Sequence, residues 1–380
     1  MEKKRALVLA SVASMIQQFN MNNINLLLEN GFDVDVVCNC KEGSTISNEK
    51  IKEMIANLAD KGVMVYHVPI PRKISNIKEI YSSISRVETM CKENNYELMH
   101  CHSPIGSVVA RIAARGKVKK IIYTAHGFHF YKGAPLINWL FFFPIEYILS
   151  FVTDVIITIN KEDYEFAKKH MHAKKVEYIP GIGIDTKRFV FNNYDVNSKR
   201  AEFGITEKDV MLISIGELND NKNHEFVVRA ISKMDNERIH YFIAGKGEKE
   251  HFLEMLAKDL NVNLHLLGYR TDVVELLNCS DVYVFPSKRE GLSVALMEAM
   301  AAGLPCVVSC IRGNVDLIEE GKGGYLFKLS SIDGLSNALK KLLENKKQMK
   351  KFGRYNQEII KKFDVCRVMN SYERLLNSDS

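Results

Sequence analysis

Short apolar runs alternate with amphipathic stretches along the chain. In the first half, runs that predict strands lie at residues 5–10, 34–37, 63–68, 96–102, 120–124 and 155–159. Helical periodicity separates several of them, at 15–30, 50–61, 74–95 and 106–116. Short apolar runs bounded by turn residues are typical of strands buried on both faces. Their alternation with helices predicts an α/β fold with a doubly wound, mostly parallel sheet.

The second half of the chain repeats this pattern. Strands are predicted at 210–215, 240–244, 264–267 and 281–285, and helices at 224–234, 248–260 and 273–278. Between the halves, residues 178–189 contain Pro180, Gly181 and Gly183, which are typical of an interdomain linker. We therefore expect one domain at 1–183, a second at 184–358, and a C-terminal helix at 359–380 that packs back on the first domain.

Composition narrows the class of protein. The 380 residues are 46% hydrophobic and 26% charged, as in soluble globular proteins with ample core. A net charge of +6 is compatible with anionic ligands or an anionic membrane surface. The eight cysteines include no Cys-x-x-Cys pair, which favours reduced, mostly buried thiols over a disulfide framework. Neither half holds a Gly-x-Gly-x-x-Gly motif, which disfavours a dinucleotide-dependent oxidoreductase.

One stretch of the second half, residues 287–310, combines a strand end, a tight turn, a helix and a further strand. Ser293 is a good N-cap for the helix predicted at 294–302, and Gly303 suits its left-handed C-terminal residue. The free amides of residues 291–295 then gather at a helix N-terminus, where partial positive charge favours phosphate.

Two glutamates flank this predicted phosphate site. Glu290 directly precedes Gly291, and Glu298 lies eight residues later, inside the helix. Ionised carboxylates accept hydrogen bonds from hydroxyls, so the pair suits a ligand with hydroxyls beside its phosphates, such as a nucleotide-sugar. The alternative is a solvated turn glutamate followed by an ordinary glutamate on a helix face.

Histidines follow strand ends in the first half of the chain. His102 ends one predicted strand, and His126 and His129 come after the next. Ligands of doubly wound sheets bind beyond the carboxyl ends of the strands, which places these histidines for ligand contact. Structural histidines in loops are the alternative.

Asp33 and Asp35 form an Asp-x-Asp pattern, which can hold a metal ion. They open a predicted strand rather than close one, so both carboxylates point to one face at the wrong end of the sheet. We expect no metal site there.

The most apolar segment is 134–153, APLINWLFFFPIEYILSFVT. Its length approaches the roughly 20 residues of a membrane span, but Pro144 and Glu146 interrupt it. A helix at a membrane interface fits better, with Trp139, Tyr147 and the phenylalanines as anchors. A buried or domain-edge helix is the alternative. Basic neighbours that would suit anionic lipid are Arg111, Arg115, Lys117, Lys119, Lys120 and Lys132.

Several motifs resemble those of retaining glycosyltransferases of family 4. The second half carries GELNDNKN (216–223), AGKG (244–247), LGYRTDVVELLNCSDVYVFPS (267–287) and EGLSVALMEAMAAGLPCV (290–307) in the family's order. HCHSPIGSVVAR (100–111), YTAHGFHFYKG (123–133) and IPGIGIDTKRF (179–189) resemble the first half of members that build capsules and exopolysaccharides. The resemblance covers essentially the full chain and implies the GT-B fold. In that fold, two Rossmann-like doubly wound domains face an interdomain cleft, the first binding the acceptor and the second the nucleotide-sugar.

The resemblance also implies residue roles. Glu290 is expected to bind hydroxyls of the donor sugar, Glu298 the ribose, and Lys222 the diphosphate. His126 matches a histidine that faces the reacting sugar. Further donor-binding positions are Gly216, Glu217, Asn221, Gly245, Gly268, Tyr269, Arg270, Gly291, Leu292 and Ser293, whereas His102 and His129 are expected on the acceptor side.

The chain departs from the family at two places. Glu217 stands where many members have arginine, and residues 11–14 replace the usual glycine pair after the first strand. Lys222 and the helix amides must then supply more of the positive charge at the diphosphate.

The resemblance implies a retaining transferase that moves a hexose or N-acetylhexosamine from a UDP-sugar to a growing, polyprenyl-diphosphate-linked glycan in capsule or exopolysaccharide synthesis. We expect no metal and no other cofactor, because Lys222 and the helix N-terminus take the place of Mg²⁺. The expected location is the cytoplasm, peripheral on the inner membrane face through 134–153, and no nucleic-acid partner is expected. The alternatives are a non-catalytic nucleotide-sugar-binding protein and a UDP-sugar epimerase of GT-B-like architecture.

Overall fold

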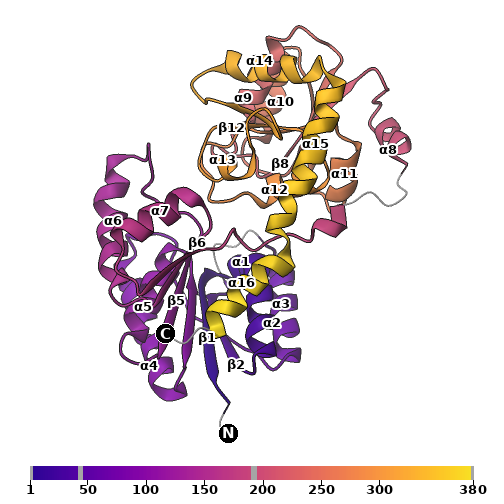
Figure 1. The fold of residues 1–380 in the computed structure, drawn as a ribbon. Coiled ribbons are helices and arrows are strands. Elements are labelled where there is room, and N and C mark those ends of the chain that lie inside the picture. Colours follow the sequence, from indigo (N-terminus) through magenta and orange to yellow (C-terminus); the bar gives the residue numbers. More distant parts are fainter. Residues whose placement is uncertain (1–2, 42–45, 190–194, 378–380) are drawn as a thin grey trace. The chain divides into compact units, whose positions relative to one another are not determined.

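The computed structural model describes residues 3–41, 46–189 and 195–377, and the chain forms two units (Figure 1). Unit 1 consists of Met1–Ile182 and Val368–Ser380, and unit 2 of Gly183–Arg367. The C-terminal helix, α16 (Val365–Asn377), begins later than the predicted residue 359. The chain turns first at Asp364, whose backbone is extended and whose carboxylate accepts the amide of Cys366. Unit 2 therefore reaches nine residues beyond the predicted end at 358.

Unit 1 is built on a parallel sheet of seven strands with helices on both faces. The strand order is β3-β2-β1-β4-β5-β6-β7. The strands are β1 (Arg5–Val12), β2 (Asp33–Asn39), β3 (Met64–His67), β4 (Leu98–His102), β5 (Lys120–Ala125), β6 (Val155–Thr158) and β7 (Lys175–Tyr178). The helices are α1 (Ala13–Phe19), α2 (Met21–Glu29), α3 (Asn48–Asp60), α4 (Ile77–Asn94), α5 (Pro104–Ala114), α6 (Leu136–Ser150) and α7 (Lys161–His170).

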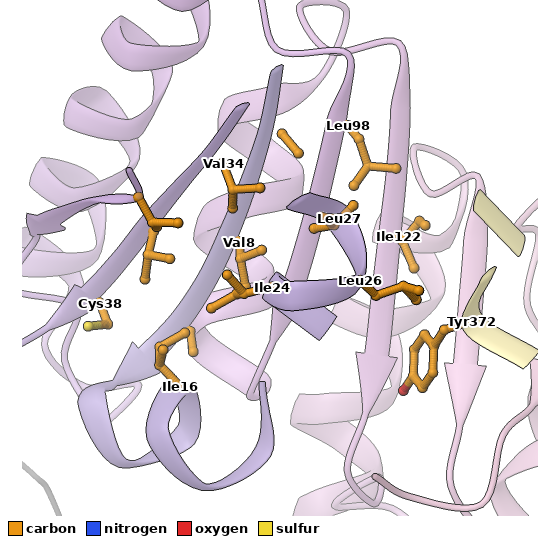
Figure 2. Packing of buried hydrophobic residues seen from close by; sticks show 14 of the residues in the cluster. Val8, Ile16, Ile24, Leu26, Leu27, Val34, Cys38, Leu98, Ile122 and Tyr372 are labelled. Carbon is orange, nitrogen blue, oxygen red and sulfur yellow. The ribbon is translucent and has the colours of Figure 1, made fainter. Parts of the chain in front are cut away.

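Strand β1 explains why the first sheet reads as continuous apolar runs. Ala6 and Val8 pack into one core cluster, whereas Leu7 and Leu9 pack into another. Alternate side chains of a strand point to opposite faces, so a sheet covered on both faces requires apolar residues at every position. Tyr372 of α16 belongs to the first cluster, where it lies near Ile122 in Figure 2.

Unit 2 repeats this architecture with six parallel strands in the order β10-β9-β8-β11-β12-β13. The strands are β8 (Val210–Ile215), β9 (Ile239–Ala244), β10 (Asn263–Gly268), β11 (Val282–Phe285), β12 (Cys306–Ser309) and β13 (Gly324–Phe327). The helices are η1 (Thr186–Phe189), α8 (Val196–Glu202), α9 (His224–Ser232), α10 (Glu250–Asp259), α11 (Val273–Cys279), α12 (Val294–Ala301), α13 (Asn314–Leu317), α14 (Ile332–Leu343), α15 (Lys346–Ile360) and η2 (Lys361–Phe363). The prediction of two Rossmann-like domains is confirmed.

Both sheets reverse their strand order once, between β1 and β4 in unit 1 and between β8 and β11 in unit 2. Crossover helices leave in opposite directions at such a point, so a crevice opens beyond the carboxyl ends of the two central strands. Ligands of doubly wound sheets commonly bind at such reversal points.

The single helix predicted at 15–30 is wrong, because Asn20 divides it into α1 and α2. Asn20 is fully buried, and its side-chain amide donates to the carbonyl of Met15. Its own carboxamide oxygen accepts a hydrogen bond from Asn23. An asparagine side chain that bonds to nearby backbone competes with helical hydrogen bonds and favours a break.

The carboxylate of Asp35 has a structural role at the amino end of the first sheet. It accepts hydrogen bonds from Arg5, at 2.8 Å, and from the hydroxyl of Tyr96. The described residues contain no group of three or more His, Cys, Asp or Glu side chains placed to hold a metal ion.

A buried ion pair that the sequence did not indicate joins α6 to α5. The guanidinium of Arg111 is fully buried and lies 2.8 Å from the carboxylate of Glu146. It stacks on Tyr123 at 4.2 Å, and the Tyr123 hydroxyl donates to the same carboxylate. The expectation that Arg111 faces lipid is therefore wrong, because its guanidinium is buried and paired with the carboxylate of Glu146.

Replacing Glu146 with alanine leaves the Arg111 charge buried and unpaired, so we expect the free energy of unfolding to fall by about 3–5 kcal/mol. Urea denaturation followed by circular dichroism measures this change. The double variant Arg111→Met/Glu146→Leu removes both charges and should recover most of the loss. Glu88→Ala, which breaks ion pairs with Lys92 and Lys117 at the surface, is the control and should cost at most about 1 kcal/mol. A loss below 1 kcal/mol for Glu146→Ala would contradict the interpretation.

Candidate active site of unit 2

An ion pair spans the point where the second sheet reverses. Lys222 follows β8 and Glu290 follows β11, and their Nζ and Oε1 atoms lie 2.7 Å apart. Both side chains are mostly buried, with exposed fractions of 20% and 15%. The ammonium also lies 4.9 Å from the ring centroid of Phe285. Lys222 and Glu290, which were predicted as separate site residues, thus form one ion pair.

Hydrogen bonds join the two loops that carry this pair. The Asn221 carbonyl accepts the amide of Lys288 at 2.8 Å, and the Asn221 side chain donates to the carbonyl of Arg289 at 3.0 Å. Asn223 donates to the carbonyl of Pro286 at 3.2 Å. Asn221, which was predicted to bind the donor, therefore holds the loops together in this structure.

Glycines let the backbones approach each other at this edge. A Cβ atom on Gly216, whose φ is +155°, would lie 3.2 Å from Cε of Lys222. A Cβ atom on Gly245 would overlap the carbonyl oxygen of Gly216, and Gly245 in turn bridges to Gly268. The three predicted glycines thus come together, and the stem of Lys222 lies where a side chain at position 216 would be.

The N-terminus of α12 lies beside Glu290. Ser293 caps the helix by accepting the amide of Leu296 at 3.3 Å, as predicted. Among the described residues, none accepts a hydrogen bond from the amides of Gly291, Leu292 or Ser293. Free amides at a helix N-terminus attract anions, so this turn offers donors to a phosphate beside the Lys222 ammonium.

Glu298 lies on α12, largely buried and without a hydrogen-bond partner among the described side chains. Burial raises the pKa of its carboxyl to about 7, and the positive charge of Arg188 on η1 partly offsets this. Arg188 precedes both central strands in the chain, and sequence reasoning missed it. The hydroxyl of Tyr283, buried on β11 without a described partner, is a second polar group that was missed.

Other predicted donor-binding residues are engaged with near neighbours. The exposed Glu217 accepts a hydrogen bond from Asn219 at 3.0 Å. Arg270 pairs with Asp272, its Nε lying 2.7 Å from Oδ1. Tyr269 is 65% exposed.

The predicted histidines all lie in unit 1. His102 is fully buried, and its Nδ1 lies 3.2 Å from Nε2 of His126. His102 thus contacts another histidine in this structure, not the surface where an acceptor could bind. His129 stacks on Phe142 at 4.5 Å.

Serines close the reversal point of unit 1, where the family's glycine pair is missing. The hydroxyl of Ser11 accepts the amide of Gly106 at 2.8 Å, and the Ser11 amide donates to the hydroxyl of Ser103 at 2.9 Å. A Cβ atom on Gly106 would lie 2.8 Å from the Ser11 nitrogen. Gly106 of α5 therefore provides the close approach to β1.

Comparison with known proteins agrees with this geometry. The family described as "Glycosyl transferases group 1" matches residues 195–359, and "Glycosyl transferase 4-like" matches residues 7–160. EpsD of Bacillus subtilis is 31% identical over 376 residues, which cover 96% of this chain and 94% of EpsD. The chain belongs to glycosyltransferase family 4.

This glycosyltransferase is also similar to a second curated protein and to a solved structure. An Escherichia coli protein named UDP-Gal:alpha-D-GlcNAc-diphosphoundecaprenol alpha-1,3-galactosyltransferase is 31% identical, over 89% of this chain and 87% of its own length. The crystal structure of Anabaena HepE in complex with UDP superimposes with a TM-score of 0.78 at 16% identity, covering 99% of this chain and 100% of HepE. The predicted GT-B fold is thereby confirmed.

Burial of Glu298 makes the free energy of unfolding of the glycosyltransferase depend on pH. The pKa of Glu298 is higher in the folded state than in the unfolded state, so ionisation opposes folding as pH rises from about 4.5 to about 7. Glu298→Gln should therefore stabilise the ligand-free protein by about 2 kcal/mol more at pH 8 than at pH 5. Urea titrations at both pH values measure this. Glu254→Gln, on the exposed surface of α10, is the control; equal effects of the two variants would contradict the assignment.

Proposed function

We propose that this glycosyltransferase moves a hexose or N-acetylhexosamine from a UDP-sugar to a polyprenyl-diphosphate-linked glycan, without a metal ion and with retention at the anomeric carbon. The single observation that supports this most is the Lys222–Glu290 pair beside the free amides of α12. It sets a cation, a hydroxyl acceptor and a phosphate-binding turn at one reversal point.

Lys222 and the helix amides serve the leaving group. When the bond between the anomeric carbon and the phosphate oxygen breaks, negative charge grows on the diphosphate. A fixed ammonium and amides that already point at that charge need no reorganisation, and such groups often supply the largest catalytic effect. They perform here the role that Mg²⁺ has in other transferases.

The two glutamates hold the rest of the donor. Glu290 uses one carboxylate oxygen for Lys222, which leaves the other to accept hydroxyls of the sugar. Glu298 accepts the ribose hydroxyls. The acceptor hydroxyl then attacks the anomeric carbon from the face of the departing phosphate, and its proton passes to the phosphate oxygen that leaves.

The acceptor class rests on named relatives. Besides the Escherichia coli galactosyltransferase, a Campylobacter jejuni protein named N,N'-diacetylbacillosaminyl-diphospho-undecaprenol alpha-1,3-N-acetylgalactosaminyltransferase is 30% identical, over 50% of this chain. Both names describe polyprenyl-diphosphate acceptors, which supports a lipid-linked glycan as the acceptor here.

Donor turnover tests the active site. With a panel of UDP-sugars and a polyprenyl-diphosphate-linked acceptor, we expect UDP release that Lys222→Ala and Glu290→Ala each reduce by roughly 100- to 1,000-fold. Lys233→Ala, which removes an exposed ion pair with Asp333, should leave the rate unchanged. Full activity of Glu290→Ala would refute the site. Tight UDP binding without turnover on any donor would favour a non-catalytic binding protein.

Helix α6 supports a second proposal, peripheral contact with an anionic membrane. No helix among the described residues has the length and apolarity that crossing a bilayer requires. One face of α6 nevertheless exposes Leu140 by 71% and Phe141 by 55%, and Leu136, Ile137 and Ile148 extend this face. Trp139, which was expected as an anchor, is partly buried and packs against the core residue Phe130. An apolar helix face next to cationic residues such as Lys132 suits anionic headgroups.

Vesicle sedimentation tests this contact. The protein should sediment with vesicles that contain phosphatidylglycerol, and Leu140→Ser/Phe141→Ser should weaken binding by at least about tenfold. The control Phe252→Ser/Met255→Ser alters two comparably exposed apolar residues on α10 of unit 2 and should have no effect. Equal binding of both double variants would show that α6 is not the contact.

A further inference from the structure

The pair His102–His126 raises the question of which ring nitrogens carry protons. His102 ends β4 and His126 follows β5, and the neighbouring strands pair His102 with Thr124. Nδ1 of His102 lies 3.2 Å from Nε2 of His126. The rings also lie close, with centroids 5.4 Å apart.

Both rings are neutral near pH 7. Burial lowers the pKa of His126 to about 4 and that of His102 well below its ordinary value. A hydrogen bond between two neutral imidazoles needs one N–H donor and one bare nitrogen. Either His102 donates from Nδ1, or His126 donates from Nε2.

The other ring nitrogen of His102, Nε2, distinguishes these two arrangements. His102 is 0% exposed, and its Nε2 has no hydrogen-bond partner among the described residues. If His126 donated, His102 would carry its proton on Nε2 and bury an N–H without an acceptor. If His102 donates, Nε2 is only a bare lone pair, and unpaired buried donors are rarer than under-satisfied acceptors.

Neighbouring groups keep the His102 ring in place. The His100 ring lies against it, with centroids 4.2 Å apart. His100 is itself fixed by a contact of 2.9 Å between its Nε2 and the hydroxyl of Thr124. Tyr372, on the returning helix α16, packs against His100, with ring centroids 6.0 Å apart. His102 therefore cannot turn its Nδ1 away from His126 without displacing a packed core.

We propose that His102 is a positioning residue that holds His126 in the tautomer with its proton on Nδ1. Nε2 of His126 accepts from His102, so the half-buried ring presents an N–H group beyond the end of β5. His126 is then a hydrogen-bond donor to a ligand oxygen, and it does not take a proton from the acceptor. On the proposed function, that oxygen belongs to the sugar, and the acceptor's proton goes to the leaving phosphate.

Nitrogen spectroscopy of the ligand-free protein tests the tautomer directly. In protein labelled with ¹⁵N-histidine, long-range ¹H–¹⁵N correlations at pH 7.5 should show His126 protonated on Nδ1 and bare on Nε2. Signals that vanish in His126→Gln provide the assignment. Protonation of His126 on Nε2 in the wild-type protein would overturn the proposal, even if every variant at position 102 failed to fold.

Two substitutions isolate the role of His102. In His102→Asn the side-chain amide takes the place of Nδ1 and still donates, so His126 should keep its Nδ1 proton. His102→Leu has no donor, so Nε2 of His126 should lose its hydrogen bond and its ¹⁵N resonance should move downfield, toward that of a bare imidazole nitrogen. The exposed His172→Asn is the control and should leave the His126 signals unchanged. An Nε2 resonance of His126 that is the same in the wild-type protein and in His102→Leu would also overturn the proposal. Because this measurement needs no substrate, an absence of UDP-sugar turnover would reject the proposed function separately.

Discussion

The Lys222–Glu290 ion pair is the interaction on which the second unit's site depends. The sheet reverses its strand order there, so the loops after β8 and β11 diverge unless something joins them. The ion pair joins the two loops, and so do three hydrogen bonds between Asn221 or Asn223 and the backbone that follows β11. A ligand phosphate would compete with Glu290 for the ammonium while leaving the loops joined through the asparagines. Charge at the site can thus respond to the ligand without movement of the backbone.

The two units use the same topology for different chemistry. In unit 2 the reversal point holds charged groups and free amides, which suit an anion. In unit 1 serines join the strands at the reversal point, and the half-buried, neutral His126 follows the next strand. A neutral, hydrogen-bonding surface suits hydroxyl-rich molecules, because it adds no charge that would need a counterion. The division matches a transferase that handles one charged and one polar substrate portion.

Much of the fold was legible in the sequence because parallel strands covered on both faces are apolar at every position. The family resemblance also indicated the glycines at 216, 245 and 268. A Cβ atom at position 245 would overlap the Gly216 carbonyl, and Gly216 and Gly268 have positive φ angles. The pairing of distant side chains could not be predicted from the sequence. Arg111 and Glu146 meet across 35 residues and Lys222 and Glu290 across 68, and local patterns carry no information on such distances. The same holds for Arg188, whose positive charge lowers the pKa of Glu298 from a segment expected only to link domains.

The return of helix α16 to unit 1 bears on how the chain is made. Val368, Tyr372 and Leu375 complete a core whose other members were synthesised more than 180 residues earlier. Unit 2 is continuous in sequence and can fold as it emerges, whereas unit 1 must wait with part of its apolar surface uncovered until α16 has been synthesised. A ribosome that stops before α16 thus releases a complete unit 2 attached to an incomplete unit 1. Such a fragment would expose apolar surface on unit 1 that α16 normally covers, and chaperones and proteases would recognise it.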